Sequence, residues 1–537
     1  MKKLLLPVLL AATLLGAGSL AQAQTAAPVV EITTNISTNT TWSNKNIYLL
    51  KSNFIYVTPG TTLTIEPGTI IKGDKTSKAT LVVQRGGKLI AAGTAQQPIV
   101  FTSNEAPGNR RRGDWGGIVI AGSAPVNLTN PTVEATPDSN FGGTDPNDNS
   151  GILRYVRIEF PGIAFAPDTE INGLTLGGVG AGTEINYVQI SYSGDDAFEW
   201  FGGTVNAKHL IAFRTLDDNW DTDNGFRGKV QYAYSLRDPN VGDVSGSNGF
   251  ESDNNKDGTT ATPQTAPVFS NVTDIVERTA DLNTNVRSAM HLRRNSAISI
   301  LNSVFTGYRT GLLLDGSASQ ANATSGELQL RNDVLAGMPT NYAQQSGGTY
   351  NVQGFFEEAS RANTVYAAES TLQFQQGTYT LTNPLVLPGA TSPLLSGADF
   401  TNAKVTDAFF DKVNFRGAFG TQDWTQGWTN FDPQTTPYTS GIVLGSRPKS
   451  DQLQQLTVTP NPTAGATTLH FDLKRGGTAT VRILDLTGRQ VATVLTDRQL
   501  AAGQQQVSLP ETLHAGVYVA TVSTNETTQS VRFVVAN

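Results

Sequence analysis

The stretch YVQISYSGDDAFE, residues 187–199, contains the unit that decides the fold. Residues 187–192 form an alternating apolar segment, and after a short turn the string Asp196-Ala197-Phe198-Glu199 places an apolar residue behind a small one. Alternation with a period of two is typical of a half-buried β-strand. The stretch therefore predicts two short strands joined by a turn.

The same unit recurs through the middle of the chain, each time behind an alternating segment. No repeat sustains a helical period, and β-branched and aromatic residues dominate, which disfavours a helical solenoid. Two strands and two turns per repeat describe one coil of a parallel β-helix. Residues 253–267 would form an insertion in the longest repeat. The apolar members of the unit, which we expect to stack in a row, are Leu174, Phe198, Phe226, Phe250, Met290 and Leu312.

The first coils contain the strings LVVQRGGKL, residues 81–89, and DWGGI, residues 114–118. These strings resemble the opening coils of secreted bacterial right-handed β-helix proteins with a pectin-lyase-like fold. The strings FRGAF, residues 415–419, and WTQGWT, residues 424–429, are similar to the closing region of one such group in Bacteroidota. The resemblance implies an all-β chain whose body, residues 24–440, is a right-handed parallel β-helix.

A separate C-terminal segment, residues 455–537, follows a polar linker, residues 441–454. The ordered motifs TPNPT, residues 459–463, VRILDLTGR, residues 481–489, and LHAGVYV, residues 513–519, resemble the type A C-terminal sorting domain of type IX secretion cargo in Bacteroidota. The resemblance implies that the type IX machinery is a partner and that the body is released or attached to the outer cell surface. Alternating runs predict a small immunoglobulin-like β-sandwich, for which an ordinary accessory domain is the alternative. The sorting signal is assigned to Pro460, Asn461, Pro462, Gly488, Gly516 and Tyr518.

The N-terminal residues 1–23 have the pattern of a Sec signal peptide. Lys2 and Lys3 precede an apolar run, and the small residues Ala21 and Ala23 predict cleavage before Gln24. That run is too short for a spanning helix, and no later run approaches the roughly 20 apolar residues that a membrane crossing needs. We therefore expect no transmembrane segment in the mature chain, which is secreted or attached to the outer surface.

Composition excludes several classes of chemistry. The chain has no cysteine, so it can form no disulfide and carries no thiolate nucleophile. Its formal net charge is −7, and the acidity lies in the body. Nucleic acid, whose phosphates demand a basic surface, is therefore not an expected partner. Neutral glycans, cations and other proteins remain.

Carboxylates concentrate in the middle coils, where equivalent positions stack about 4.8 Å apart. A pair of carboxyl groups about 5 to 5.5 Å apart suits a retaining glycosidase, and a wider pair suits an inverting one. The catalytic candidates are Asp195, Asp217 and Asp223, with Arg227 as a basic residue. The ligand-binding candidates are Glu199, Trp200, Trp220 and Glu251, and the indole rings could offer flat surfaces to sugar rings.

Oxygen ligands at alternate positions also favour a hard cation such as Ca²⁺. The metal candidates are Asp221, Asp223, Asp253, Asn255 and Asp257, although neither run completes an EF-hand loop. A purely structural alternative exists. Asp and Asn favour turns, and Glu199, Arg227 and Glu251 would align as an ion-pair ladder on successive coils.

The sequence thus favours a secreted or cell-surface glycan-binding or structural module, with an extracellular polysaccharide as the expected ligand and Ca²⁺ as the one candidate cofactor. The alternative is a polysaccharide lyase or glycoside hydrolase that uses the carboxylates of the middle coils. A pure adhesin or surface scaffold is a third possibility and predicts no acidic cleft.

Overall fold

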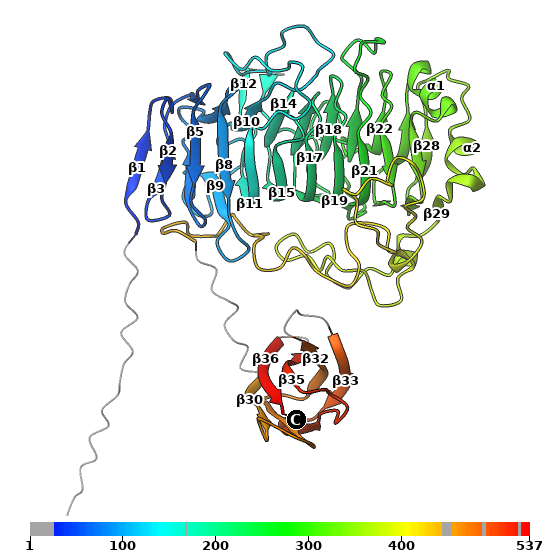
Figure 1. Ribbon diagram of the computed structural model, residues 1–537. Coiled ribbons are helices and arrows are strands. Elements are labelled where there is room, and N and C mark those ends of the chain that lie inside the picture. The colour runs from blue at the N-terminus through cyan, green and yellow to red at the C-terminus, as the bar shows by residue number, and fades with distance from the viewer. Residues whose placement is uncertain (1–25, 167–168, 443–452, 486–489, 525–527, 537) are drawn as a thin grey trace, which may run out of the picture. The chain divides into compact units, whose positions relative to one another are not determined.

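The computed structural model describes residues 26–166, 169–442, 453–485, 490–524 and 528–536. The chain divides into two compact units, whose described parts are residues 26–442 and 453–536. The first unit is a right-handed parallel β-helix and the second is a β-sandwich, so the predicted all-β fold class is confirmed (Figure 1). No helix in the described residues is long and apolar enough to cross a membrane.

Each coil of the body adds one strand to a ten-stranded parallel sheet. The strands are short because a turn must follow each of them. They are β4 (Phe54–Val57), β7 (Thr80–Val83), β10 (Gly117–Ala121), β14 (Leu174–Gly177), β16 (Phe198–Phe201), β18 (Trp220–Asp223), β20 (Phe250–Ser252), β22 (Ser288–Leu292), β25 (Thr310–Leu314) and β28 (Thr340–Ala343).

The rest of each coil adds one or two strands to a second parallel sheet of 17 strands. Its members are β1 (Val29–Ile32), β2 (Thr40–Trp42), β3 (Ile47–Leu50), β5 (Thr62–Ile65), β6 (Ile70–Gly73), β8 (Lys88–Ala92), β9 (Ile99–Ser103), β11 (Gly151–Glu159), β15 (Glu184–Ser191), β17 (Asn206–Phe213), β19 (Lys229–Arg237), β21 (Val268–Val276), β23 (Ser299–Leu301), β24 (Val304–Thr306), β26 (Gln329–Arg331), β27 (Val334–Ala336) and β29 (Thr364–Tyr366). A short antiparallel pair, β12 (Ala164–Ala166) and β13 (Thr169–Glu170), lies outside both sheets.

The predicted row of stacked apolar residues is confirmed with one correction. Leu174 pairs with Phe198 and Phe198 pairs with Trp220, which in turn pairs with Phe250. Trp220 therefore takes the place predicted for Phe226. Phe226 lies in the turn before β19 and is still fully buried, with its ring 5.3 Å from that of Trp200. The prediction was wrong because both aromatic residues lie close behind an Asn in the same coil, Trp220 directly after Asn219 and Phe226 two residues after Asn224.

The long strands of the 17-stranded sheet bend at one residue each, and these residues lie above one another. Tyr155, Tyr187, His209 and Tyr232 occupy this position in four successive coils, with φ between 50° and 63°. Their rings stack with centroids 4.3, 4.1 and 5.1 Å apart, which offsets the cost of a left-handed backbone. We call these four residues the aromatic stack. Asn271 continues the row.

Two short helices and one 3₁₀ turn lie between the strands of the last coils: α1 (Ser317–Ser325), α2 (Val352–Phe356) and η1 (Ala359–Arg361). Two further 3₁₀ turns, η2 (Glu369–Leu372) and η3 (Pro393–Leu395), follow the last strand, β29. The chain then runs back along the body to its first coils, in yellow to orange in Figure 1. We call residues 396–442 the return segment. It meets the coils in reverse order through Asp399 with Asn302, Asp411 with Gln231, Asn430 with Gln189, and Thr439 with Ala27.

The C-terminal unit consists of two antiparallel sheets around a small apolar core. Leu469, Val481 and Phe533 are fully buried in that core. The three-stranded sheet contains β30 (Leu453–Thr459), β31 (Thr468–Leu473) and β34 (Gly503–Ser508), and the four-stranded sheet contains β33 (Gln490–Leu500), β32 (Gly477–Asp485), β35 (Gly516–Thr524) and β36 (Thr528–Val535).

Candidate functional site

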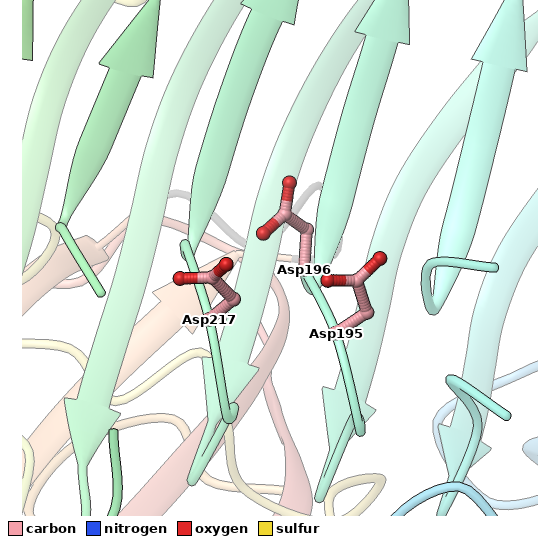
Figure 2. Close-up of side chains that lie close together, drawn as sticks. All are labelled: Asp195, Asp196 and Asp217. Carbon is pink, nitrogen blue, oxygen red and sulfur yellow. The ribbon is translucent and has the colours of Figure 1, made fainter. Parts of the chain in front are cut away.

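The candidate site is a group of carboxylates on the outer face of β16 and β18 and on the turns that precede them. Phe198 and Trp220 point into the body, so the next residue of each strand, Glu199 and Asp221, points out of it. Figure 2 shows Asp195 and Asp196 in the turn of one coil beside Asp217 in the turn of the next. The parallel register brings together carboxylates that lie some twenty residues apart in sequence.

Two sets of three carboxylates come into close range. Asp195, Asp196 and Asp217 each offer one oxygen atom, and these atoms all lie within 4.8 Å of one another. The same holds for Asp196, Glu199 and Asp221. We call these five residues the acidic cluster. The predicted residues Asp195, Asp217, Glu199 and Asp221 thus belong to one site, and Asp196 joins its two halves.

Burial raises the pKa of every member of the acidic cluster, and the charges of nearby carboxylates add to it. Burial is the main cause for Asp195, and the charge of Asp217 adds to it. For Asp217 burial raises the pKa to about 6, partly opposed by the hydroxyl of Ser245. For Asp221 the largest contribution after burial comes from Glu199. Near neutral pH the cluster must therefore hold protons or gain a cation.

Two oxygen atoms of the cluster are buried without a hydrogen bond from the described residues. They are Oδ1 of Asp217 and Oδ1 of Asp221. The other oxygen of Asp217, Oδ2, accepts a hydrogen bond of 2.7 Å from Ser245. Buried polar atoms are rarely left unpaired in proteins, so these two oxygens indicate a missing partner. Carboxylate oxygens in this density suit a hard divalent cation.

The next coil, which contains β20, differs because its carboxylates already have cationic partners. Arg293 bonds both Glu251 and Asp253, and Arg294 bonds Asp253 at 2.7 Å. Burial alone would raise the pKa of Glu251, but His291 and Arg293 outweigh it and leave that pKa lowered. Glu251, a predicted ligand-binding residue, therefore lies in a neutralised network next to the acidic cluster and outside it.

The second Asp of each Asp-Asp pair has a structural function. The carboxylate of Asp196 accepts a hydrogen bond of 2.7 Å from the backbone N–H of Asp218. Asp218 does the same for Asn248, and the amide oxygen of Asn248 accepts from Ser288 at 3.2 Å. This ladder agrees with the structural interpretation of the turns. The first Asp of each pair, Asp195 or Asp217, remains available on the outer face.

The predicted ion-pair ladder is wrong in its central member. The register places Asp221 between Glu199 and Glu251, so three acids stack without an intervening base. Arg227 is exposed and forms no salt bridge with any residue that the structure describes. It therefore does not form the central rung of the predicted ladder, and its predicted catalytic role stays a prediction. The error follows from the misplaced Phe226, its neighbour in sequence.

The predicted sugar-stacking role of the two tryptophans is also wrong. Trp200 and Trp220 are both 0% exposed. Their rings pack inside the body, Trp200 on Phe226 and Trp220 on Phe198, with centroids 5.3 Å apart in each pair. An indole buried in this way offers no face to a ligand. Sequence alone could not separate inward from outward aromatic residues within these short strands.

The other predicted metal ligands form turns. The Oδ1 atom of Asn255 accepts from the backbone of Asp257 and of Thr259, at 3.2 and 3.0 Å. Asp257 is exposed, and Asp253 is held by the two arginines described above. Asp223 accepts from the N–H of Asn224 at 2.5 Å, and burial raises its pKa to about 7. Of the predicted ligands, Asp221 alone joins the acidic cluster.

In the C-terminal unit the predicted sorting residues tie a loop to the sheet edge. Asn461 accepts a hydrogen bond of 2.8 Å from the N–H of Val534, and its side chain donates to the carbonyl of Arg532. Tyr518 donates to the carbonyl of His514 at 3.0 Å, and Gly516 begins β35. The residues Pro460 and Pro462 flank Asn461. Gly488 and the predicted cleavage residues Ala21 and Ala23 lie outside the described residues.

Comparison with known proteins assigns both units. Residues 34–429 match the family model of the pectate-lyase-like β-helix domain, and residues 457–536 match that of the secretion system C-terminal sorting domain. No curated protein matches the chain. Among solved structures the chain is similar to the Dettilon tailspike protein, with 9% identity and a TM-score of 0.25, over 61% of this chain and 62% of that chain. The match thus spans less than two thirds of the tailspike, and we draw no conclusion from it.

Proposed function

Because this chain belongs to the pectate-lyase-like β-helix family and ends in a type IX sorting domain, we propose that its body binds an extracellular polysaccharide through a Ca²⁺ ion held by the acidic cluster. The sorting domain makes the chain cargo of the type IX secretion system and directs it to the cell surface or the extracellular space. The bound ion and the polysaccharide are the proposed part.

The observation that carries this proposal is the pair of unpaired buried oxygens in a group of five carboxylates. A divalent cation held by Asp195, Asp196 and Asp217 would partner Oδ1 of Asp217, and one held by Asp196, Glu199 and Asp221 would partner Oδ1 of Asp221. Either ion would offset the charge repulsion that adds to burial in raising the pKa values. The coil of β20 supports the argument by contrast. There Arg293 and Arg294 already neutralise Glu251 and Asp253, so that coil needs no ion.

A cation in this place would also explain how an acidic surface could bind a glycan. Asp195 and Asp217 are only partly buried, so an ion held between them keeps part of its coordination shell toward solvent. Ca²⁺ takes six to eight oxygen ligands, and hydroxyl or carboxylate oxygens of a polysaccharide can fill the remaining positions. The polysaccharide that fits best is one that contains uronate.

The test uses purified full-length protein freed of metal with EDTA. We expect Ca²⁺ titration in a calorimeter to give saturable binding and a raised melting temperature, and polygalacturonate to bind only when Ca²⁺ is present. Asp217→Asn removes one ligand charge and should weaken Ca²⁺ binding, whereas Asp281→Asn, at an exposed position, should not. Equal Ca²⁺ binding in wild type and Asp217→Asn would refute the proposed site.

A glycoside hydrolase is the second candidate, on one observation. The pKa of Asp217 at about 6 suits a general acid, and a neighbouring carboxylate lies within reach. A polysaccharide lyase stays a further alternative, with Arg227, which is exposed, as its predicted base. Release of reducing sugar from polygalacturonate without a 4,5-unsaturated product would favour hydrolysis, an unsaturated product would favour a lyase, and binding without product would favour the binding module.

A further inference from the structure

A cavity lies on the 17-stranded sheet, between the aromatic stack and the return segment. It has a volume of about 450 Å³, within the roughly 300–1,000 Å³ of small-molecule sites. Tyr187, His209 and Tyr232 line it from the coils, and Phe415 and Trp424 line it from the return segment. The acidic cluster lies on the other sheet, so this cavity is a separate feature.

The walls of the cavity are aromatic and fixed in position. The ring of Trp424 lies 5.1 Å from that of His209 at an angle of 66°, and Phe415 lies 6.2 Å from Tyr232. The indole N–H of Trp424 donates to the carbonyl of Ala418 at 2.8 Å, which holds the ring in place. Rigid aromatic walls of this kind bind the apolar C–H surface of a flat ring without further ordering.

The polar groups of the cavity include an uncharged acceptor. Burial, helped by the charge of Lys208, lowers the pKa of His209 to about 4, so its imidazole is neutral at physiological pH. Nδ1 lies 2.9 Å from the amide oxygen of Asn186, which assigns the proton to Nδ1. Nε2 is then left as an acceptor. Thr421 and Gln422, both exposed, add a hydroxyl and an amide to the lining.

The charge of the cavity is balanced. Asp411 is the one charged residue among its lining residues, and its carboxylate already pairs with Lys208 at 2.9 Å. A cationic ligand would have to compete with that lysine, and an anionic ligand would meet the carboxylate. Aromatic walls, a neutral acceptor and a few hydroxyl and amide groups together match a neutral, hydroxylated ring.

From this geometry we propose that the cavity is a binding site for a neutral sugar unit. The apolar face of the sugar packs on Trp424, and its hydroxyls bond Nε2 of His209 and the side chain of Gln422. This inference does not rest on the proposed Ca²⁺ site. A neutral unit bound here and a uronate-containing chain bound at the acidic cluster would be recognised independently.

The tryptophans supply a selective probe. The chain has six tryptophans, and Trp424 is the half-buried one, whereas Trp42, Trp115, Trp200, Trp220 and Trp428 are at most 2% exposed. We would titrate the full chain in EDTA with cellobiose, maltose and lactose and record tryptophan fluorescence. At least one disaccharide should give a saturable change. D-galacturonic acid, which is charged, should give none.

Variants then locate the site. Gln422→Ala, at an exposed position that does not threaten the fold, and His209→Phe, which keeps the stacked ring, should each weaken sugar binding by about tenfold, as expected for a lost hydrogen bond. Asp281→Asn is the matched control and should bind as wild type. No saturable change with any of the three disaccharides, an equal response to D-galacturonic acid, or unchanged binding in both cavity variants would each overturn the proposal. Failure here leaves the Ca²⁺ titration unaffected, so the two proposals fail separately.

Discussion

The side-chain amide of Gln189 bonds both backbone groups of Asn430, although the two residues are 241 positions apart. Its Nε2 donates to the carbonyl at 2.8 Å, and its Oε1 accepts from the N–H at 2.9 Å. Gln231 bonds Asp411 in the same way, at 2.9 and 2.8 Å. The two amides thus act as substitutes for a neighbouring strand and satisfy the backbone of the return segment.

Replacement of Gln189 by Ala should destabilise the body. The substitution leaves a partly buried N–H and carbonyl of Asn430 without partners, which costs about 1–3 kcal/mol. Urea denaturation followed by fluorescence measures the free energy of unfolding. Gln96→Ala, at an exposed position, is the control and should change it by less than about 0.5 kcal/mol. Equal stability of both variants would contradict the proposed function of the amide.

The substitution Asp196→Asn should leave the protein about as stable as wild type, whereas Asp196→Ala should destabilise it. Its carboxylate accepts from the N–H of Asp218, and an amide oxygen can accept in its place, whereas Ala leaves that N–H unpaired. We expect Asp196→Ala to lose about 1–3 kcal/mol of stability and Asp196→Asn to lose less or to gain, since it also removes a repelling charge. Thermal unfolding of both variants in EDTA gives the comparison. A larger loss of stability for Asp196→Asn than for Asp196→Ala would contradict the hydrogen-bond ladder of Asp196, Asp218 and Asn248.

The metal-free protein should become less stable as the pH rises from about 4 to about 7. The folded-state pKa values of Asp217 and Asp223 are raised to about 6 and about 7, above roughly 3.9 in the unfolded chain. The folded state therefore binds these protons more tightly, and its advantage is lost as the pH approaches the raised values. Melting temperatures in EDTA across this range provide the measurement.

The matched variant for this pH effect is Asp217→Asn, which cannot ionise. Its melting temperature should fall less over the same range than that of wild type, and Ca²⁺ should raise the wild-type value most at the upper end. A wild-type melting temperature that increases from pH 4 to pH 7 in EDTA relative to Asp217→Asn would contradict the assigned shift.

Trp200→Ala should act on stability alone. Trp200 is fully buried against Phe226 and Phe269, so its loss opens a cavity that costs about 3–5 kcal/mol. Trp200→Phe keeps most of the packing and should cost less. If the folded fraction of either variant bound polygalacturonate more weakly at saturating Ca²⁺, the assignment of Trp200 as a purely interior residue would be contradicted.

The sequence was sufficient for the fold because every coil repeats one pattern. The alternating strands and the unit around Phe198 predicted the two sheets, and the insertion at residues 253–267 was also predicted correctly. What failed was register within a coil. Trp220 and Phe226 both lie close behind an Asn. Only the strand pairing of Trp220 with Phe250 shows which of the two belongs to the stacked row.

The sequence predicted which turns contain the carboxylates of the candidate site, but it did not predict which of these side chains meet. The Asp-Asp pairs marked the right turns, but the division between Asp196, which bonds the next coil, and Asp195, which does not, depends on backbone direction. The cavity beside Trp424 was missed entirely. Its two walls come from residues some 200 positions apart, and no local pattern in the sequence joins them.

The return segment changes how the body resists unfolding from its two ends. An ordinary solenoid can fray from either tip, because each repeat touches only its neighbours. Here the backbone of Ala27 donates to Thr439, and that of Ile442 donates to Gly68, so the end of the body is fastened to its beginning. To unfold a terminal coil, the contacts of the return segment along the whole length of the body would also have to break. We therefore expect the body to unfold in a single cooperative step and not coil by coil.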